Sequence, residues 1–310
     1  MAADHDLRAL IARRKAADVI FGALGALSIA IGLLTLGALL FDLIRTGWPR
    51  LSWEFFTSFP SRRAGQAGIL SAWVGSTLIM IVTMCTALPL GVAAGIYLEE
   101  YAPKNWFTAI IEVNIANLAG VPSIIWGLMA LGLFVHSTLD LGTSIRTAGL
   151  TLGLLVLPIV IISTREAIRS IPQSIREASY ACGATQWQTT WHHVIPYAMG
   201  GILTGSIIGL SRAIGETAPL ITIGALSYIA YLPEGMSETP PFLTWRFWKF
   251  QWLGSGYTAL PIQMFNWISR PDRRFHENAA AAGVILILMT LSMNAIAIFL
   301  RYRLRKRVQW

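Results

Sequence analysis

Residues 177–219 read EASYACGATQWQTTWHHVIPYAMGGILTGSIIGLSRAIGETAP. The first half of this stretch, from Glu177 past Gly183, is largely polar. The second half is an apolar run in which Arg212 and Glu216 are the charged residues. A charge inside a bilayer is costly and, where it occurs, usually serves a function. The stretch therefore predicts a polar loop followed by a membrane span that carries a functional pair of charges.

The rest of the chain is equally apolar. Its 310 residues are 55% hydrophobic and only 13% charged, which is unlike a soluble domain. The runs are continuous rather than alternating, which favours helices over the strands of a β-barrel. Crossing about 30 Å of hydrocarbon needs roughly 20 such residues. We therefore predict an all-α membrane protein with a single membrane domain, residues 19–300, and six transmembrane helices at about 19–41, 69–98, 110–135, 147–164, 197–226 and 278–300.

The basic residues predict the orientation. An even number of spans puts both termini on one side, and clusters of Lys and Arg near each end place that side in the cytoplasm. Residues 1–18 are then a cytoplasmic segment, and residues 301–310 form a basic cytoplasmic tail with Arg301, Arg303, Arg305, Lys306 and Arg307. The net charge of +8 is attributed to contact with membrane lipid rather than to nucleic-acid binding.

Two connections are long enough to have structure of their own. The cytoplasmic loop 165–196 is too polar to enter lipid, and it predicts a short amphipathic helix over about 173–181 that ends near Gly183. The external loop 227–277 contains many aromatic residues and five prolines. We interpret it as short helices that lie on the outer membrane surface or as a platform for an external partner, two roles that are compatible.

The usual signatures of catalysis are absent from the sequence. It contains no G-x-x-x-x-G-K-[ST] string for nucleotide phosphates, no H-E-x-x-H or G-x-S-x-G motif, and no cluster with metal-ligand spacing. The two cysteines, Cys85 and Cys182, are expected to be unpaired thiols. We therefore predict a protein that is not an enzyme, with no catalytic residues, no cofactor and no metal.

The polar loop resembles the EAA loop of the permeases of ATP-binding-cassette (ABC) importers. Glu177, Ala178, Gly183 and Pro196 fall in the register of that motif, with Ser179 in place of its second alanine. In that family the loop forms a coupling helix that seats in a groove of the ATPase subunit. The resemblance implies that Glu177, Ala178, Gly183 and Pro196 couple this chain to such an ATPase.

Three further strings look like those of phosphate-importer permeases, in particular of the PstA type. They are AGVPSIIWGL at 119–128, LSRAIGETAPL at 210–220 and ALPIQMFNWISRP at 259–271. The resemblance implies the type I (MetI-like) permease fold in the bacterial inner membrane, with a cytoplasmic coupling helix. It also implies a transport subunit for phosphate ion that works with a second phosphate permease (PstC-type), two cytoplasmic ATPase subunits (PstB-type) that hydrolyse the ATP, and an extracytoplasmic phosphate-binding protein.

The charged pair of the fifth span is the predicted substrate pathway. Arg212 and Glu216 are four residues apart and would share a helix face, and Gly215 and Pro219 allow the helix to open beside the glutamate. Arg212 is either a weak contact for the anion, with Glu216 as its partner, or half of an ion pair that locks this helix against the companion permease. The pathway is expected to include Arg212, Glu216, Thr217, Pro122 and Ser123.

Two other functions stay open at this point. The transported ion could be another oxyanion, because sulfate, molybdate and phosphonate offer similar chemistry. The chain could also be an autonomous proton-coupled anion carrier with Glu216 as its proton site, although such carriers usually contain two repeated halves and this sequence shows none.

Overall fold

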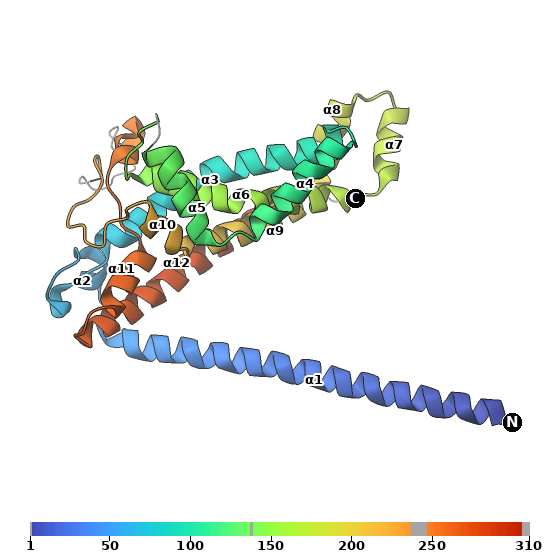
Figure 1. Cartoon of the computed structure of the whole chain (residues 1–310), viewed down its shortest axis with the longest axis horizontal. Coiled ribbons are helices and arrows are strands. Elements are labelled where there is room, and N and C mark those ends of the chain that lie inside the picture. The colour runs from blue at the N-terminus through green and yellow to red at the C-terminus, as the bar shows by residue number, and fades with distance from the viewer. Residues whose placement is uncertain (1, 137–138, 237–246, 306–310) are drawn as a thin grey trace.

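Within residues 2–136, 139–236 and 247–305, which the computed structural model describes, every regular element is helical (Figure 1). Three helices form the centre of the molecule: α3 (Leu70–Ile96), α6 (Ile145–Arg169) and α9 (Ile195–Ile214). Small residues allow these helices to approach closely. A Cβ added at Gly91 of α3 would lie 2.7 Å from Val160 on α6, and one added at Gly209 of α9 would lie 2.7 Å from Val156.

Five helical segments are long and apolar enough to cross a membrane. The remaining predicted span, 110–135, which is the third along the chain, is instead two helices with a bend of 107° between them. The five segments are Arg13–Arg50, Leu70–Tyr101, Ile145–Arg169, Gln186–Ile214 and Arg274–Arg303. The first segment consists of α1 (Ala2–Gly47) and the 3₁₀ turn η1 (Trp48–Arg50), and the second consists of α3 and the π-helical turn η3 (Tyr97–Tyr101). The third is α6. The fourth runs from α8 (Gln186–Thr189) through the π-helical turn η5 (Thr190–Val194) to α9, and the fifth lies in α12 (Arg274–Arg305).

The bent pair consists of α4 (Trp106–Ala119) and α5 (Ser123–Ala130), and α5 continues into the π-helical turn η4 (Leu131–Val135). Gly120 ends α4, and Pro122 precedes the first residue of α5. Proline has no N–H and clashes with a preceding helical turn, so a helix cannot run through it undisturbed. The expected span is therefore interrupted in its middle, at the AGVP string.

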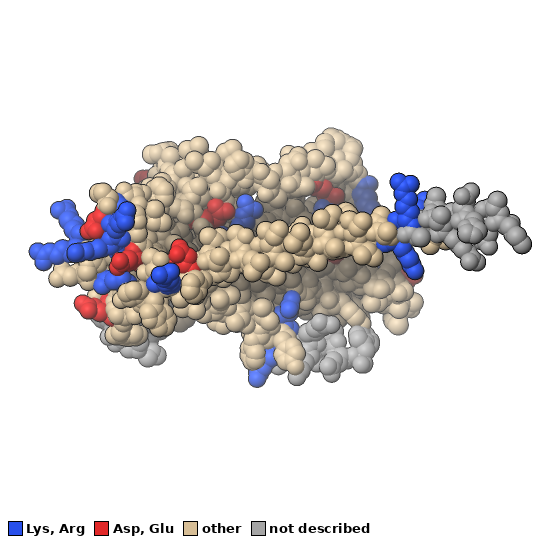
Figure 2. Space-filling model, turned by 90° about the horizontal axis from the view of Figure 1, so that it is seen from below, with Lys and Arg blue, Asp and Glu red and all other residues tan. Residues whose placement is uncertain are grey.

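Helix α1 stands away from the other helices (Figure 1). It reaches α12 at its C-terminal end, where a Cβ added at Gly47 would lie 2.7 Å from the backbone nitrogen of Ala281. The side chains of residues 19–39 are all exposed. Charged side chains gather toward the two ends of the face seen in Figure 2, and the length of α1 between them is largely uncharged. This surface suits lipid or another apolar chain.

The two termini of the described chain point to the same end of the molecule as α8 and α7 (Gln173–Ala181) (Figure 1). The opposite end holds α2 (Trp53–Thr57) and α11 (Leu260–Ile268). This arrangement is the one that an even number of crossings requires. Which end faces the cytoplasm remains a prediction, and residues 306–310 of the predicted tail, with Lys306 and Arg307, lie outside the described residues.

Hydrogen bonds from Arg50 hold together the end of the molecule that carries α2 and α11. Arg50 donates from Nε to Oδ1 of Asn278, which lies 228 positions away at the start of α12, at 2.7 Å. Its Nη2 donates to the carbonyl oxygens of Ala64 and Ala67 at 3.1 and 2.9 Å. Nearby, Phe55 and Trp267 pack with their ring centroids 6.0 Å apart. The loop after α1 is therefore held firmly against the last helix.

The aromatic loop 227–277 is only partly a surface structure. It contains α11 and the one-turn 3₁₀ helices η7 (Phe247–Lys249) and η8 (Gln251–Gly254). Trp252, Tyr257 and Trp267 are buried in the core, whereas Trp248, Phe250 and Phe265 are exposed. The exposed rings fit the expected interfacial role, and the buried ones pack instead. Residues 237–246, with Pro240, Pro241 and Trp245, lie outside the described residues.

Candidate functional site

The two strings that predict a substrate pathway meet in the fold. Each string contains a break between two helices. The helix after the break is α5 in the AGVP string and α10 (Ala218–Thr222) in the RAIGET string, and these two helices contact each other. Gly127 on α5 faces α10 so closely that an added Cβ would lie 2.6 Å from Cα of Pro219 and would overlap the hydroxyl of Thr222. The absence of a side chain at Gly127 therefore lets the two half-helices pack directly on each other.

Arg212 and Glu216 lie at the break between α9 and α10. The predicted span 197–226 opens here, beside the glutamate as expected: α9 ends at Ile214, and a turn follows in which Glu216 N donates to the Ala213 carbonyl at 3.2 Å. The turn still brings the charges together: Arg212 Nε donates to Glu216 Oε1 at 3.3 Å. In the single chain the arginine side chain is 42% exposed and the glutamate 18%.

The other predicted pathway residues stand at the starts of the half-helices. Thr217 is the N-cap residue of α10, and its side chain makes no capping hydrogen bond. Pro122 is exposed at the N-cap of α5, and Ser123, the first residue of that helix, is half-buried. Helix N-termini carry a partial positive charge. The break thus offers one guanidinium beside a carboxylate, which suits weak and reversible contact with an anion.

Sequence reasoning missed a polar contact beside this pair. Ser211, the neighbour of Arg212, donates from Oγ to Oδ1 of Asn294 on α12 at 2.7 Å. Seven residues before it, Thr204 accepts a hydrogen bond from Arg301 at 2.7 Å. The available signal was Asn294 itself, an asparagine far inside the apolar run 278–300, since polar side chains at such depth usually pair across helices.

The predicted coupling segment forms as expected in its local structure. The helix α7 spans Gln173–Ala181, which are the residues predicted, and Gly183 follows with a φ of +84°, a left-handed conformation that favours glycine. Glu177, Ala178 and Gly183 are exposed, and Pro196 stands in the first turn of α9. Glu177 and Ala178 therefore share an accessible surface with the turn after α7.

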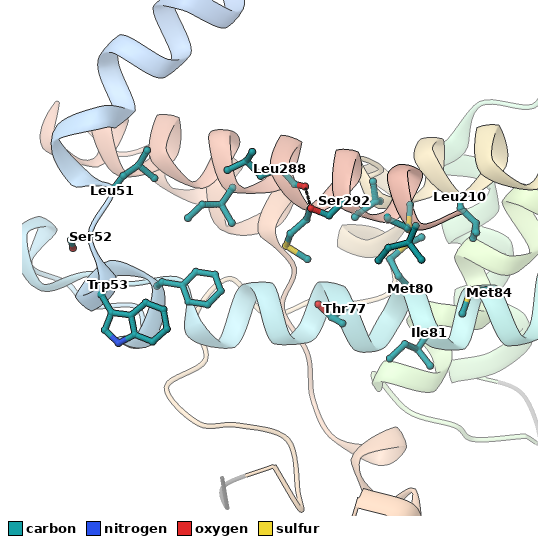
Figure 3. A pocket seen from close by; sticks show the side chains of 16 residues that line it. Leu51, Ser52, Trp53, Thr77, Met80, Ile81, Met84, Leu210, Leu288 and Ser292 are labelled. Carbon is teal, nitrogen blue, oxygen red and sulfur yellow. Dashed lines mark hydrogen bonds between the residues drawn. The ribbon is translucent and has the colours of Figure 1, made fainter. Parts of the chain in front are cut away.

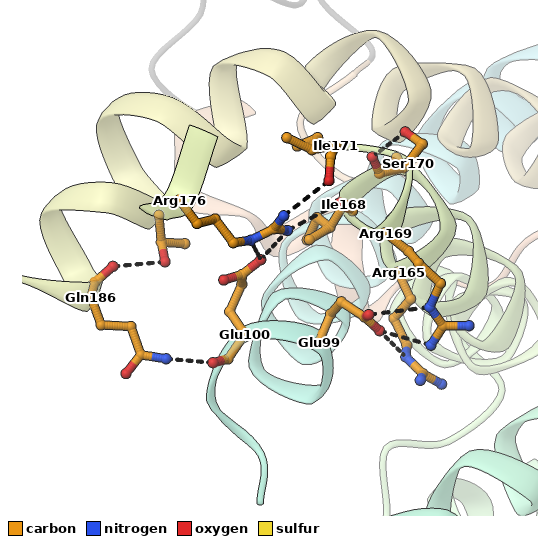
Figure 4. A network of polar contacts seen from close by, with 11 residues as sticks. Glu99, Glu100, Arg165, Ile168, Arg169, Ser170, Ile171, Arg176 and Gln186 are labelled. Carbon is orange, nitrogen blue, oxygen red and sulfur yellow. Dashed lines mark hydrogen bonds and ion pairs between the residues drawn. The ribbon is translucent and has the colours of Figure 1, made fainter. Parts of the chain in front are cut away.

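A charged network lies behind α7 (Figure 4). Glu100 in η3 accepts from Arg176 of α7, and its neighbour Glu99 accepts from Arg169 of α6. Sequence reasoning did not identify these glutamates as part of the site. The signal for them was the presence of two acidic residues directly after an apolar run and of several arginines in the loop 165–176.

A large apolar cavity lies elsewhere. It has a volume of about 740 Å³ and runs between α3, α9, α12 and the segment before α2 (Figure 3). Of its hydroxyl groups, Thr77 donates to the Trp73 carbonyl at 2.9 Å and Ser292 donates to the Leu288 carbonyl at 2.7 Å. Both hydroxyls are thus engaged within their own helices, and the cavity offers little to hold an anion.

In the part of the chain that the structure describes, no group of three or more His, Cys, Asp or Glu side chains is placed to hold a metal ion. Cys85 and Cys182 are both exposed free thiols.

The geometry can be compared with known proteins. Residues 87–310 match the family described as binding-protein-dependent transport system inner membrane component. The probable ABC transporter permease protein YqgI of Bacillus subtilis is 32% identical over 289 residues, which cover 91% of this chain and 93% of that protein. The phosphate transport system permease protein PstA of Haemophilus influenzae is 31% identical over 281 residues, 91% of this chain and 92% of the relative. PstA 1 of Mycobacterium tuberculosis is 28% identical over 306 residues, 97% and 92% of the two chains.

A solved structure of the MetNI methionine ABC transporter, in an inward-facing conformation, has the same arrangement of helices. The TM-score is 0.52 at 16% sequence identity, over 76% of this chain and 94% of that chain. At this identity the likeness concerns the fold alone, and it confirms the expected MetI-like permease fold. Since the family match covers most of the chain and relatives above 30% identity align along nine-tenths of it, the protein belongs to the family of binding-protein-dependent transport system inner membrane components.

Proposed function

We propose that this chain is the transmembrane permease subunit of an ATP-driven importer of inorganic phosphate. The observation that carries the proposal is the alignment, over more than nine-tenths of both chains, with relatives named as phosphate transport system permease proteins. The broken helices and the single arginine at their junction are consistent with it, because a phosphate ion carries one to two negative charges near neutral pH and must be released after it crosses.

In this proposal the pathway runs past the junction of α5 and α10. Arg212 supplies the positive charge, and Glu216, 3.3 Å away, competes for it and keeps the anion weakly held. The proposed pathway also includes Thr217, Pro122 and Ser123, which stand at the starts of the half-helices. Interrupted helices of this kind are used by transporters to place helix ends and free backbone groups at the membrane midplane.

The energy comes from other subunits. The family members compared above are permease subunits rather than enzymes, and this chain has no phosphate-binding loop. We propose that two PstB-type ATPase subunits serve the complex and that one of them binds the surface of α7 around Glu177, Ala178 and Gly183, with Pro196 starting the next helix. A PstC-type permease supplies the second half of the channel, and a phosphate-binding protein docks at the end that carries α2 and α11.

We propose a matching orientation in the bacterial inner membrane. The end with α7, α8 and both termini faces the cytoplasm, in agreement with the basic residues near each terminus. The domain layout then has residues 1–18 and 301–310 in the cytoplasm, the membrane domain from 19 to 300, the coupling loop at 165–196 and the aromatic loop 227–277 outside.

The test is reconstitution of the complete complex in proteoliposomes, with ATP supplied on the side of the ATPase subunits and labelled phosphate with its binding protein on the other. ATP-dependent phosphate uptake that excess sulfate or molybdate does not reduce is expected. Uptake of another oxyanion in preference to phosphate would replace the substrate, and uptake by this chain alone, driven by a proton gradient without ATP, would favour the autonomous carrier. A complex with a catalytically inactive ATPase subunit is the control.

A further inference from the structure

Two consecutive glutamates at the end of α3 face different helices. Glu99 and Glu100 both lie in η3, the π-helical turn that continues α3. Glu99 reaches α6, and Glu100 reaches α7 (Figure 4). Successive positions of a helix point in different directions, so one turn can hold two neighbours at once. The end of α3 is therefore a junction between the predicted coupling helix and the transmembrane bundle.

The contact to α7 is made by a forked and buried ion pair. Arg176 donates from Nε and Nη2 to Oε1 of Glu100 at 3.1 and 2.6 Å. The two side chains are only 11% and 6% exposed. The remaining donors are used as well, since Nη1 donates to the Ile171 carbonyl at 3.0 Å and Nη2 to the Ile168 carbonyl at 3.2 Å. One side chain of α7 thus holds the ends of both α3 and α6.

The contact to the bundle continues through Glu99. Arg169 binds both of its carboxylate oxygens, from Nε at 3.2 Å and from Nη2 at 3.0 Å. Arg165, which is buried, lies 3.4 Å from the same carboxylate through Nε and 2.6 Å from Glu112 of α4 through Nη2. The network therefore joins α3, α4 and α6 at the end of the molecule that carries α7.

Helix α8 contacts both η3 and α7. Gln186 of α8 donates to the backbone carbonyl of Glu100, and the hydroxyls of Ser179 and Thr189 are hydrogen-bonded at 2.9 Å. In contrast, the covalent connection after α7 is an exposed turn through Gly183, where a Cβ would meet nothing within 4 Å. Side-chain contacts, more than the connecting turn, therefore determine how α7 is oriented.

We propose that Glu100 and Arg176 are positioning residues that set the orientation of α7, and that the Glu99–Glu100 junction transmits a displacement of α7 to α3, α4 and α6. The proposal rests on the proposed function, in which an ATPase subunit binds the opposite, exposed surface of α7. Because Glu177 and Ala178 on that surface differ from the residues of the network, docking of the ATPase and transmission of its movement are separable properties of the same helix.

The test compares coupling with assembly in the reconstituted complex. Glu100→Gln keeps the shape of the side chain and removes its charge, and Arg176→Lys keeps a charge but loses the fork. Both variants should still bind the ATPase subunits and hydrolyse ATP. Phosphate uptake per ATP hydrolysed should fall by roughly 2- to 30-fold, the range found for changes within coupled networks. Glu166→Gln is the control, because Glu166 is 64% exposed and lies 3.5 Å from Arg169 in the same region; its ratio should not change.

The two native cysteines supply a second readout. Cys85 on α3 and Cys182 directly after α7 are both exposed, so spin labels on them report the distance between the two helices in a complex whose other subunits lack cysteine. The distance distribution should be narrow in the wild type and in Glu166→Gln, and broader in Glu100→Gln and Arg176→Lys. This measurement does not depend on phosphate, so it tests the network even if wild-type uptake contradicts the proposed function.

Three results would overturn the proposal. The first is an unchanged distance distribution in both variants, and the second is an unchanged ratio of uptake to hydrolysis. The third is failure of both variants to assemble, since the pair would then be a requirement for folding rather than a device that orients α7.

Discussion

Replacing Arg212 by Gln removes the guanidinium from the break between α9 and α10 and keeps a hydrogen-bonding side chain. The 3.3 Å contact and the 42% exposure of the arginine describe a partly solvated pair. Exposed pairs contribute about 0.2–1 kcal/mol to stability, so the variant should insert and assemble. A lost hydrogen bond to a charged group is worth about 1.5–3 kcal/mol. If Arg212 contacts the anion, uptake should therefore fall by roughly 10- to 100-fold, since each 1.36 kcal/mol is tenfold in rate.

The double variant Arg212→Gln with Glu216→Gln separates the two interpretations of the pair. If the charges only stabilise the break, removing both leaves no unpaired carboxylate, and uptake should return toward the wild-type rate. If Arg212 touches phosphate, the double variant stays as slow as the single one, because the positive charge is still missing. The assay is ATP-dependent phosphate uptake in proteoliposomes that contain equal amounts of each subunit.

Arg301→Gln is the matched control for loss of an arginine from the bundle. Arg301, on α12, donates to the hydroxyl of Thr204 at 2.7 Å. Thr204 lies on the same helix as Arg212 but away from the break, so the replacement removes no contact of the proposed pathway and should leave uptake within about twofold of the wild type. Full recovery of uptake in the double variant would reject Arg212 as a contact for phosphate.

Three further predictions follow from single features of the chain. The purified chain should hydrolyse no ATP, because it has no phosphate-binding loop, and turnover by protein free of any ATPase subunit would contradict this. Gly183→Asp should weaken binding of the ATPase subunits or separate hydrolysis from uptake, measured by co-purification and transport. Gly183→Ala, which adds only the left-handed strain of about 1 kcal/mol, is its control, and normal docking and uptake in Gly183→Asp would make α7 an ordinary surface helix. Gly127→Ala should lower the stability of the complex by about 1–3 kcal/mol and slow uptake, because its Cβ would overlap Thr222 on α10. Gly132→Ala, whose Cβ meets nothing within 4 Å, should have no such effect in a thermal unfolding assay.

Much of the helical layout could be predicted because a membrane span must be long and continuously apolar. The run at 69–98 begins one residue before α3 and ends in η3, and the run at 147–164 lies within α6. The short helix α7 has the bounds that its polar sequence and the following glycine indicated. In these cases the signal is local, since it depends on residues within a few turns of one another.

The bends and the polar contacts could not be predicted in the same way. Pro122 indicates that a helix stops, but the 107° bend between α4 and α5 depends on what α5 packs against. Likewise, Arg50 and Asn278 are 228 positions apart, and no local pattern links them. The buried Trp267 shows the same limit, because an aromatic composition suggests an interfacial loop without saying which rings face the core.

The two parts of the candidate site are joined by one stiff helix. Helix α9 has 20 residues, about 30 Å at 1.5 Å per residue, and it runs from the segment after α7 to Arg212 on its last turn. Along this length it packs on α6 through small residues, with Gly201 against Ala167 and Gly205 against Ser163. Glycine contacts of this kind bring the two helices close together. We therefore expect a displacement at the start of α9 to reach its other end, where the chain breaks and the charged pair lies.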